Sequence, residues 1–83
     1  MLKVKSWVQT CGACPAQWEG TLDNGDCFYA RFRFGHGYVA TGKTMDDAIF
    51  GDVLVEWNTD GEYDGVMSTS ELKEKTKGVL GWD

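Results

Sequence analysis

The chain has 83 residues with a formal net charge of −5, and 42% of its residues are hydrophobic and 13% aromatic. This length predicts one small domain over residues 1–83 and excludes a two-domain arrangement. The aromatic content excludes wholesale disorder, and no apolar run approaches the roughly 18 residues of a membrane span. Residues 1–5 lack the apolar segment of a secretory signal, so we expect a cytoplasmic protein with reduced thiols.

The pattern predicts an α+β fold with a small antiparallel meander of four to five strands, a short helix near 45–50 and a C-terminal helix near 69–77. The first strand is indicated by period-two alternation over residues 2–9. That alternation places four side chains on one face: Leu2, Val4, Ser6 and Val8.

The strongest β pattern covers residues 16–34, around the turn signal Asp23-Asn24-Gly25-Asp26. Its second half places four side chains on one face: Phe28, Ala30, Phe32 and Phe34. A two-residue turn at Asn24-Gly25 would mix apolar with charged neighbours, and a register slip flips every side chain. A three-residue loop with Gly25 left-handed sorts apolar with apolar, and it predicts these pairs: Ala16 with Phe32, Trp18 with Ala30, and Gly20 with Phe28.

The remaining elements are predicted from turn and cap signals. Gly35-His36-Gly37 indicates a second turn, followed by a strand over 38–41 whose register stays open. Thr44 caps the short helix, and a fourth strand follows over 53–57. Ser68 and Glu71 form a capping box for the C-terminal helix. The tail is expected to pack with Leu72 against the Phe28 and Phe32 face through Val79, Leu80 and Trp82.

Negative charge is concentrated in residues 46–64, which contain seven acids and no base. These acids are the predicted partner-binding residues: Asp46, Asp47, Asp52, Glu56, Asp60, Glu62 and Asp64. Such a segment repels a nucleic-acid backbone and attracts a basic protein surface. The alternative is a solvated face that only aids solubility.

Residues 60–71 resemble the calcium loop of an EF-hand. The predicted ligands are Asp60, Glu62, Asp64, the carbonyl of Val66, Ser68 and Glu71, with Gly65 at the sharp turn. The pattern departs from the family at Glu62, whose side chain is one methylene longer than the usual Asp or Asn, at Tyr63, and in the strand that precedes the loop. The alternative is an acidic turn that leads into a capped helix.

A CxxC pair, Cys11 and Cys14, is typical of zinc or redox sites. Cys27 and His36 are the remaining candidate zinc ligands, but nine residues of strand, about 30 Å, separate them and exclude one shared site. Tyr29, Arg31 and Arg33 share a polar face that could bind phosphate or carboxylate. The alternative is pairing of these arginines with Glu19 and the acidic segment.

Four segments stand in a fixed order: CPxQWEG at residues 14–20, Asn24-Gly25, YxRxRxG at 29–35 and DGxMSxxEL at 64–72, with Asn24-Gly25 at the place of a DG in the family pattern. This order resembles a group of short uncharacterised proteins from bacteriophages and actinobacteria. The resemblance implies a phage or mobile-element origin, and it transfers no activity or catalytic residue.

Together these features predict a non-enzymatic acidic protein that blocks a basic, nucleic-acid-binding surface of a host protein by mimicking nucleic acid. No catalytic motif is found, and neither direct nucleic-acid binding nor membrane binding is expected. A calcium-binding EF-hand-like module is the alternative, with calcium as its only cofactor. A small zinc or redox CxxC protein is the further alternative.

Overall fold

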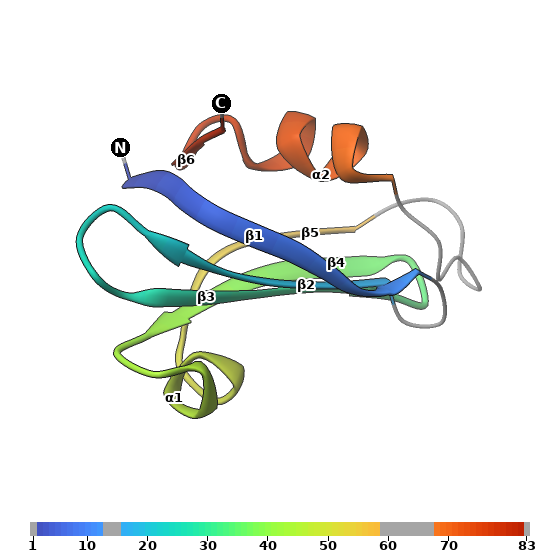
Figure 1. Ribbon diagram of the computed structural model, residues 1–83. Helices are drawn as coiled ribbons and strands as arrows, with labels where there is room; N and C mark the ends of the chain where they lie inside the picture. Colours follow the sequence, from blue (N-terminus) through green and yellow to red (C-terminus); the bar gives the residue numbers. More distant parts are fainter. Residues whose placement is uncertain (1, 13–15, 59–67, 83) are drawn as a thin grey trace.

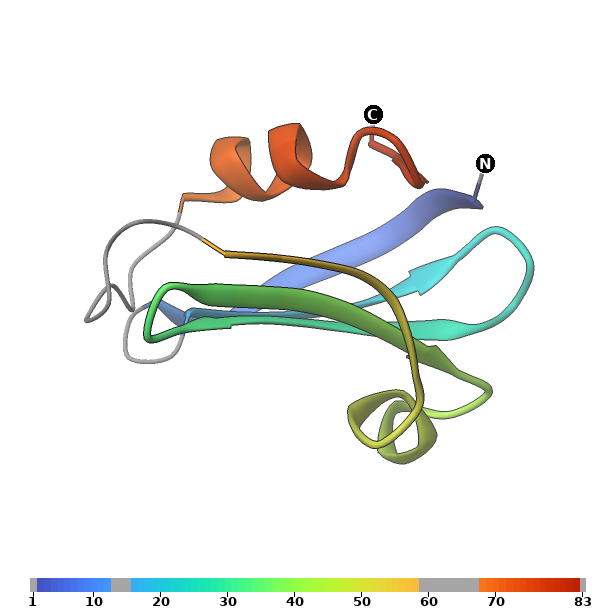
Figure 2. The same ribbon diagram turned by 180° about the vertical axis from the view of Figure 1, so that it is seen from behind.

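A computed structural model describes residues 2–12, 16–58 and 68–82, and six strands of these residues form one sheet (Figure 1). In chain order the elements are β1 Leu2–Gly12, β2 Ala16–Leu22, β3 Cys27–Arg33, β4 His36–Gly42, α1 Met45–Ile49, β5 Asp52–Asn58, α2 Thr69–Thr76 and β6 Leu80–Gly81. The sheet order is β5-β4-β3-β2-β1-β6. Figures 1 and 2 show α2 over one face, the inner face, and α1 against the other, the outer face.

The predicted α+β class with two short helices is confirmed, but the predicted four to five strands are too few. Strands β1 to β5 form an antiparallel meander, as expected. The sixth strand is the predicted tail, because Leu80 and Gly81 pair in parallel with Leu2 and Lys3 of β1. Within the described part of the chain, neither helix is long and apolar enough to span a membrane.

The three-residue hairpin loop between β2 and β3 is confirmed. Ala16 pairs with Phe32, Trp18 with Ala30 and Gly20 with Phe28. The Leu22 amide donates to the Asp26 carbonyl at 2.8 Å, and Gly25 has a φ of 91°. The left-handed backbone conformation that the last residue of such a loop adopts is unfavourable for any residue with a Cβ, so glycine is preferred there. The DNG signal therefore sets the register that sorts the two faces.

The first strand departs from its predicted alternation at a bulge. Val4 pairs with Leu22 and Ser6 with Thr21, so Lys5 is an extra residue. One extra residue reverses the faces of everything that follows. Trp7, not Val8, therefore turns to the inner face, where its ring meets Trp82 edge-on at 6.1 Å. The prediction that Ser6 and Val8 share the face of Val4 is wrong for this reason.

The second hairpin turn lies one residue earlier than predicted. Arg33 pairs with His36, which leaves Phe34 and Gly35 as a two-residue turn with φ values of 53° and 73°. Positive φ at both positions is the geometry of a type I′ turn, which matches the twist of the strands. Phe34 is consequently 60% exposed and does not join the inner face with Phe32. The Arg33 guanidinium covers its ring at 4.5 Å.

The core lies between the inner face and α2, as predicted from the aromatic pattern. Its largest fully buried side chains include Trp18, Leu22, Phe28, Phe32, Val39, Leu72 and Leu80. Val79 and Trp82 pack against this cluster from the tail. Burial at about 25 cal/mol per Å² makes these aromatic rings the main source of stability in so short a chain.

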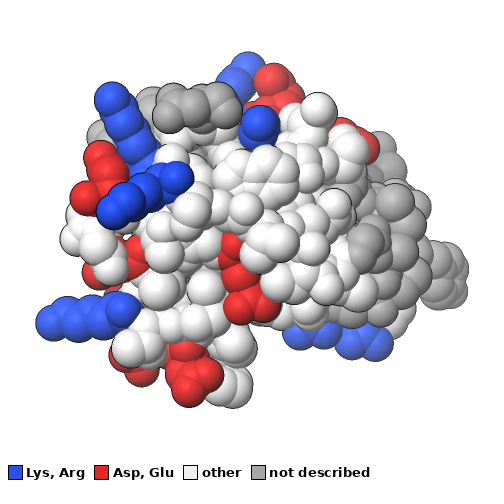
Figure 3. Space-filling model, in the orientation of Figure 1, with Lys and Arg blue, Asp and Glu red and all other residues white. Residues whose placement is uncertain are grey.

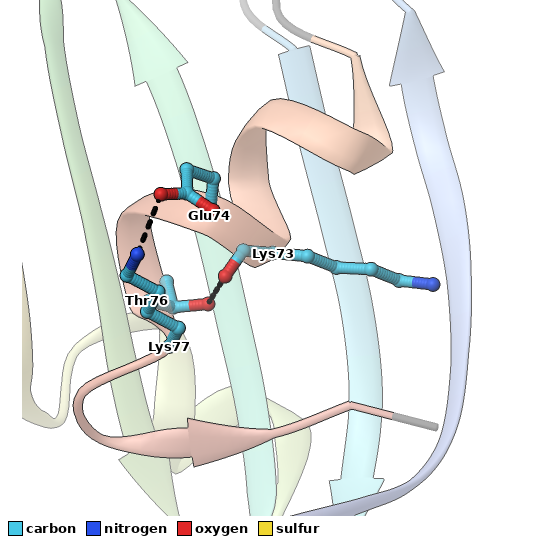
Figure 4. A network of polar contacts seen from close by, with 4 residues as sticks. All are labelled: Lys73, Glu74, Thr76 and Lys77. Carbon is cyan, nitrogen blue, oxygen red and sulfur yellow. Dashed lines mark hydrogen bonds and ion pairs between the residues drawn. The ribbon is translucent and has the colours of Figure 1, made fainter.

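Two threonines of α2 accept hydrogen bonds from the indole groups of Trp18 and Trp82. The Trp18 Nε1 donates to Thr69 Oγ1 at 3.0 Å, and the Trp82 Nε1 donates to Thr76 Oγ1 at 2.8 Å. Thr76 Oγ1, fully buried, in turn donates to the Leu72 carbonyl at 2.8 Å. Figure 4 shows Thr76 beside the exposed Lys77–Glu74 pair, in which the Lys77 ammonium lowers the pKa of Glu74.

We expect Phe32→Ala to lower the free energy of unfolding by about 3–5 kcal/mol, because it leaves a cavity beneath α2. Urea denaturation followed by tryptophan fluorescence measures this. Phe34→Ala is the matched control, since that ring is exposed, and its loss should change stability by less than about 1 kcal/mol. Equal losses for both variants would contradict the assignment of faces.

We expect Thr76→Val to lower the unfolding free energy by about 1–3 kcal/mol, because the isosteric side chain leaves the Trp82 indole without its acceptor. Thr10→Val, at an exposed position of β1, is the control and should be close to neutral. A Thr76→Val protein as stable as the wild type would show that the Trp82 indole has another partner.

Candidate partner-binding surface

The helix α1 carries two of the predicted partner-binding acids. Thr44 is its N-cap, as predicted, and its Oγ1 accepts from the Asp47 amide at 3.1 Å. Asp46 and Asp47 occupy the first turn, where carboxylates interact favourably with the helix dipole. The sequence Thr-Met-Asp-Asp therefore both begins the helix and exposes two negative charges.

Two close backbone approaches fix α1 on the outer face of the sheet. Ala48 is fully buried there, against the end of the β3–β4 hairpin. A Cβ at Gly51 would lie 2.2 Å from the Thr41 carbonyl oxygen and 2.5 Å from that of Asp47. Gly42 has a similar contact with the Asp47–Ala48 peptide. The short helix is therefore held by packing, since five residues cannot be stable alone.

An exposed apolar pair follows α1 directly. Phe50, the C-cap residue, is 90% exposed, and Val53 of β5 is 54% exposed. Asp46, Asp47 and Asp52 are exposed beside them. We call these five residues the α1 surface: Asp46, Asp47, Phe50, Asp52 and Val53. Figure 3 shows acidic side chains at the lower edge of the view, where α1 lies.

Of the other four predicted acids, the structure describes only Glu56. Glu56 lies further along β5, and its carboxylate is 3.6 Å from His36 Nε2. The other ring nitrogen of His36 lies 3.0 Å from Asn58 Oδ1. Asp60, Glu62 and Asp64 lie outside the described residues. The structure thus brings three of the seven acids together, around an aromatic side chain that charge counting did not identify.

The calcium prediction concerns a loop that is mostly outside the described residues, including Asp60, Glu62, Asp64 and Val66. Its last two ligands, Ser68 and Glu71, form the predicted capping box, with the Glu71 amide donating to Ser68 Oγ at 3.1 Å. The segment before the loop is the strand β5, as the sequence suggested, and not an entering helix. Calcium binding itself stays a prediction.

The zinc and redox prediction rests on Cys11 and on Cys14, which lies outside the described residues. Cys27 pairs with Gly42 and His36 with Arg33, at opposite ends of the β3–β4 hairpin. Their separation is about 20 Å of strand, shorter than the predicted 30 Å because the turn folds back at Phe34, and it still excludes a shared site. Among residues 2–12, 16–58 and 68–82, no three His, Cys, Asp or Glu side chains are grouped to hold a metal.

The predicted anion site at Tyr29, Arg31 and Arg33 is only partly assembled on the outer face. Tyr29 is 6% exposed, and this burial raises its pKa, while the nearby Arg31 opposes the shift. Arg33 lies over Phe34 instead. Within the part of the chain that the structure describes, no ion pair joins Arg31 to Glu19, which was the predicted alternative.

Comparisons with protein-family models, with curated proteins and with solved structures found no match to the chain. The chemistry of its own residues therefore carries the functional inference. Phe50 was missed at the sequence level because an aromatic residue after a short helix ordinarily packs inward. A local signal was Gly51, directly after Phe50, where the chain passes so close to Thr41 that a side chain would not fit.

We expect Gly51→Ala to destabilise the protein by about 1–3 kcal/mol, or to displace α1, because the added methyl group overlaps two carbonyl oxygens. Gly78→Ala is the control, since nothing lies within 4 Å of a Cβ there. That change should be neutral or stabilise by up to about 1 kcal/mol. Thermal unfolding of the two variants side by side gives the comparison, and equal melting points would contradict the tight docking of α1.

Proposed function

We propose that this protein is a non-enzymatic binding protein whose α1 surface contacts a basic protein surface. The observation that carries the proposal is Phe50, 90% exposed and bordered by Asp46, Asp47 and Asp52. Aromatic anchors surrounded by polar residues are the usual centre of a protein interface. An exposed aromatic ring among carboxylates, on a helix held in place by packing, supports binding of a protein partner rather than a solvated face that only aids solubility.

The two components of the α1 surface have different roles in association. Burial of Phe50 in a pocket of the partner contributes about 1.5–3 kcal/mol, which is roughly 10- to 150-fold in affinity. The three carboxylates steer a basic partner and disfavour acidic ones, and they act mainly on the association rate. The partner therefore has an apolar pocket within a lysine- or arginine-rich surface.

A surface of that kind is typical of proteins that bind nucleic acid. Occupying it would exclude nucleic acid by competition, which is the mimicry that the acidic segment predicts. The phage-like motif pattern supports a host protein as the target and the host cytoplasm as the location. Glu56 would add to the negative field from β5, and the roles of Asp60, Glu62 and Asp64 in partner binding stay predictions.

The test begins with capture of a partner from a bacterial extract by the immobilised protein, with and without a chelator. Affinity for the purified partner is then measured by calorimetry for the wild type, Phe50→Ala and Asp46→Lys/Asp47→Lys. We expect Phe50→Ala to weaken binding at least about tenfold at every salt concentration. The charge reversal should weaken binding at 0.1 M salt and much less at 1 M, where screening acts within about 3 Å.

Two matched variants control for nonspecific effects. Phe34→Ala removes another exposed aromatic ring, and Glu74→Lys reverses a charge on α2, on the opposite side of the sheet. Neither should change affinity. Equal affinities for all variants would refute the α1 surface, and binding lost with the chelator would favour the calcium-binding alternative.

A further inference from the structure

An open groove of about 390 Å³ lies on the outer face between α1 and the β1–β2 pair. Its lining includes Ser6, Val8, Glu19, Gly20, Thr21 and Met45. Met45 is the first residue of α1, so the groove adjoins Asp46 and Asp47. Sequence reasoning did not find this groove, because the bulge at Lys5 is what turns Ser6 and Val8 toward it.

The walls of the groove are mostly apolar. Val8 is 58% exposed and pairs with Glu19 across the strands, and Met45 closes the groove from the helix. The one facing pair of hydroxyl groups, Ser6 and Thr21, bonds internally at 2.6 Å. Gly20 lines the groove with its backbone, because a Cβ at this position would point to the inner face, toward the Phe28 ring.

Glu19 gives the groove its chemical character. Glu19 is half-buried, and its carboxylate forms no hydrogen bond or ion pair with the residues that the structure describes. Binding of a purely apolar ligand in this groove is unfavourable, because the ligand would remove water from the Glu19 carboxylate without replacing its hydrogen bonds. A cation at the end of an aliphatic stem satisfies both features.

We propose that the groove binds a lysine or arginine side chain of the partner, with its methylene stem along Val8 and Met45 and its cationic head on Glu19. That this side chain comes from the partner rests on the proposed function, in which the partner presents a basic surface to the adjoining α1. The groove then receives one basic side chain of the partner while Phe50 enters a pocket of the partner, so each protein inserts one side chain into the other.

The test uses the side-chain analogues n-butylammonium and n-butylguanidinium, followed by amide chemical shifts in ¹⁵N–¹H spectra. We expect saturable shifts at Val8, Glu19, Thr21 and Met45. In Glu19→Gln, which keeps the shape of the side chain, the dissociation constant should rise about tenfold. Glu74→Gln on α2 is the control and should leave it unchanged. Neutral n-butanol should bind much more weakly than either cation.

A second variant, Val8→Thr, keeps the volume at an exposed strand position and makes the wall polar. It should weaken n-butylguanidinium binding several-fold while the spectrum stays folded. Shifts spread over all acidic residues, or a Glu19→Gln protein that binds the cations as well as the wild type, would overturn the proposal. These probes bind without a partner, so such a result would contradict the groove proposal but not the proposed role of the α1 surface. The α1 surface is tested separately by the effect of Phe50→Ala on partner binding.

Discussion

The three-residue loop at residues 23–25 determines which side chains of β2 and β3 face α2. With Gly25 left-handed, Trp18, Phe28 and Phe32 all point to the inner face, where the core forms. A slip of one residue would send these rings to the outer face and expose more apolar surface than so small a chain can tolerate. The positions of α2, of the tail and of the free outer face all depend on this register.

Local patterns predicted those parts of the fold in which the sequence alternates without interruption. The β2–β3 register and both helix N-caps were predictable, because each depends on neighbours in the sequence. The long-range contact of Leu72 with the aromatic face was predictable because both are apolar surfaces that must be buried. The bulge at Lys5 and the early turn at Phe34 were not predictable. The bulge reverses an alternation and the turn ends one. Both result from sheet twist and from pairing with a neighbouring strand, which cannot be read from the residues of one strand alone.

The same distinction explains the candidate site. Charge density along the chain identified Asp46, Asp47 and Asp52, because these residues are close in sequence. It did not identify Phe50 as exposed, and it could not join Val8, Glu19 and Met45, which come from three different elements. The α1 surface and the groove lie next to each other on the outer face, on the side of the sheet that α2 leaves uncovered.

The parallel pairing of β6 with β1 joins residues at almost opposite ends of the chain. Compared with a hairpin of about ten residues, closing so long a loop adds about 2 kcal/mol of entropy cost, so this contact is expected to form after the local meander. During synthesis from the N-terminus onward, the edge of β1 that faces away from β2 therefore stays unpaired until residues 80–81 have been made. Once formed, the β6 contact and Trp82 cover one end of that edge, and this end should also be the first to open in the native state.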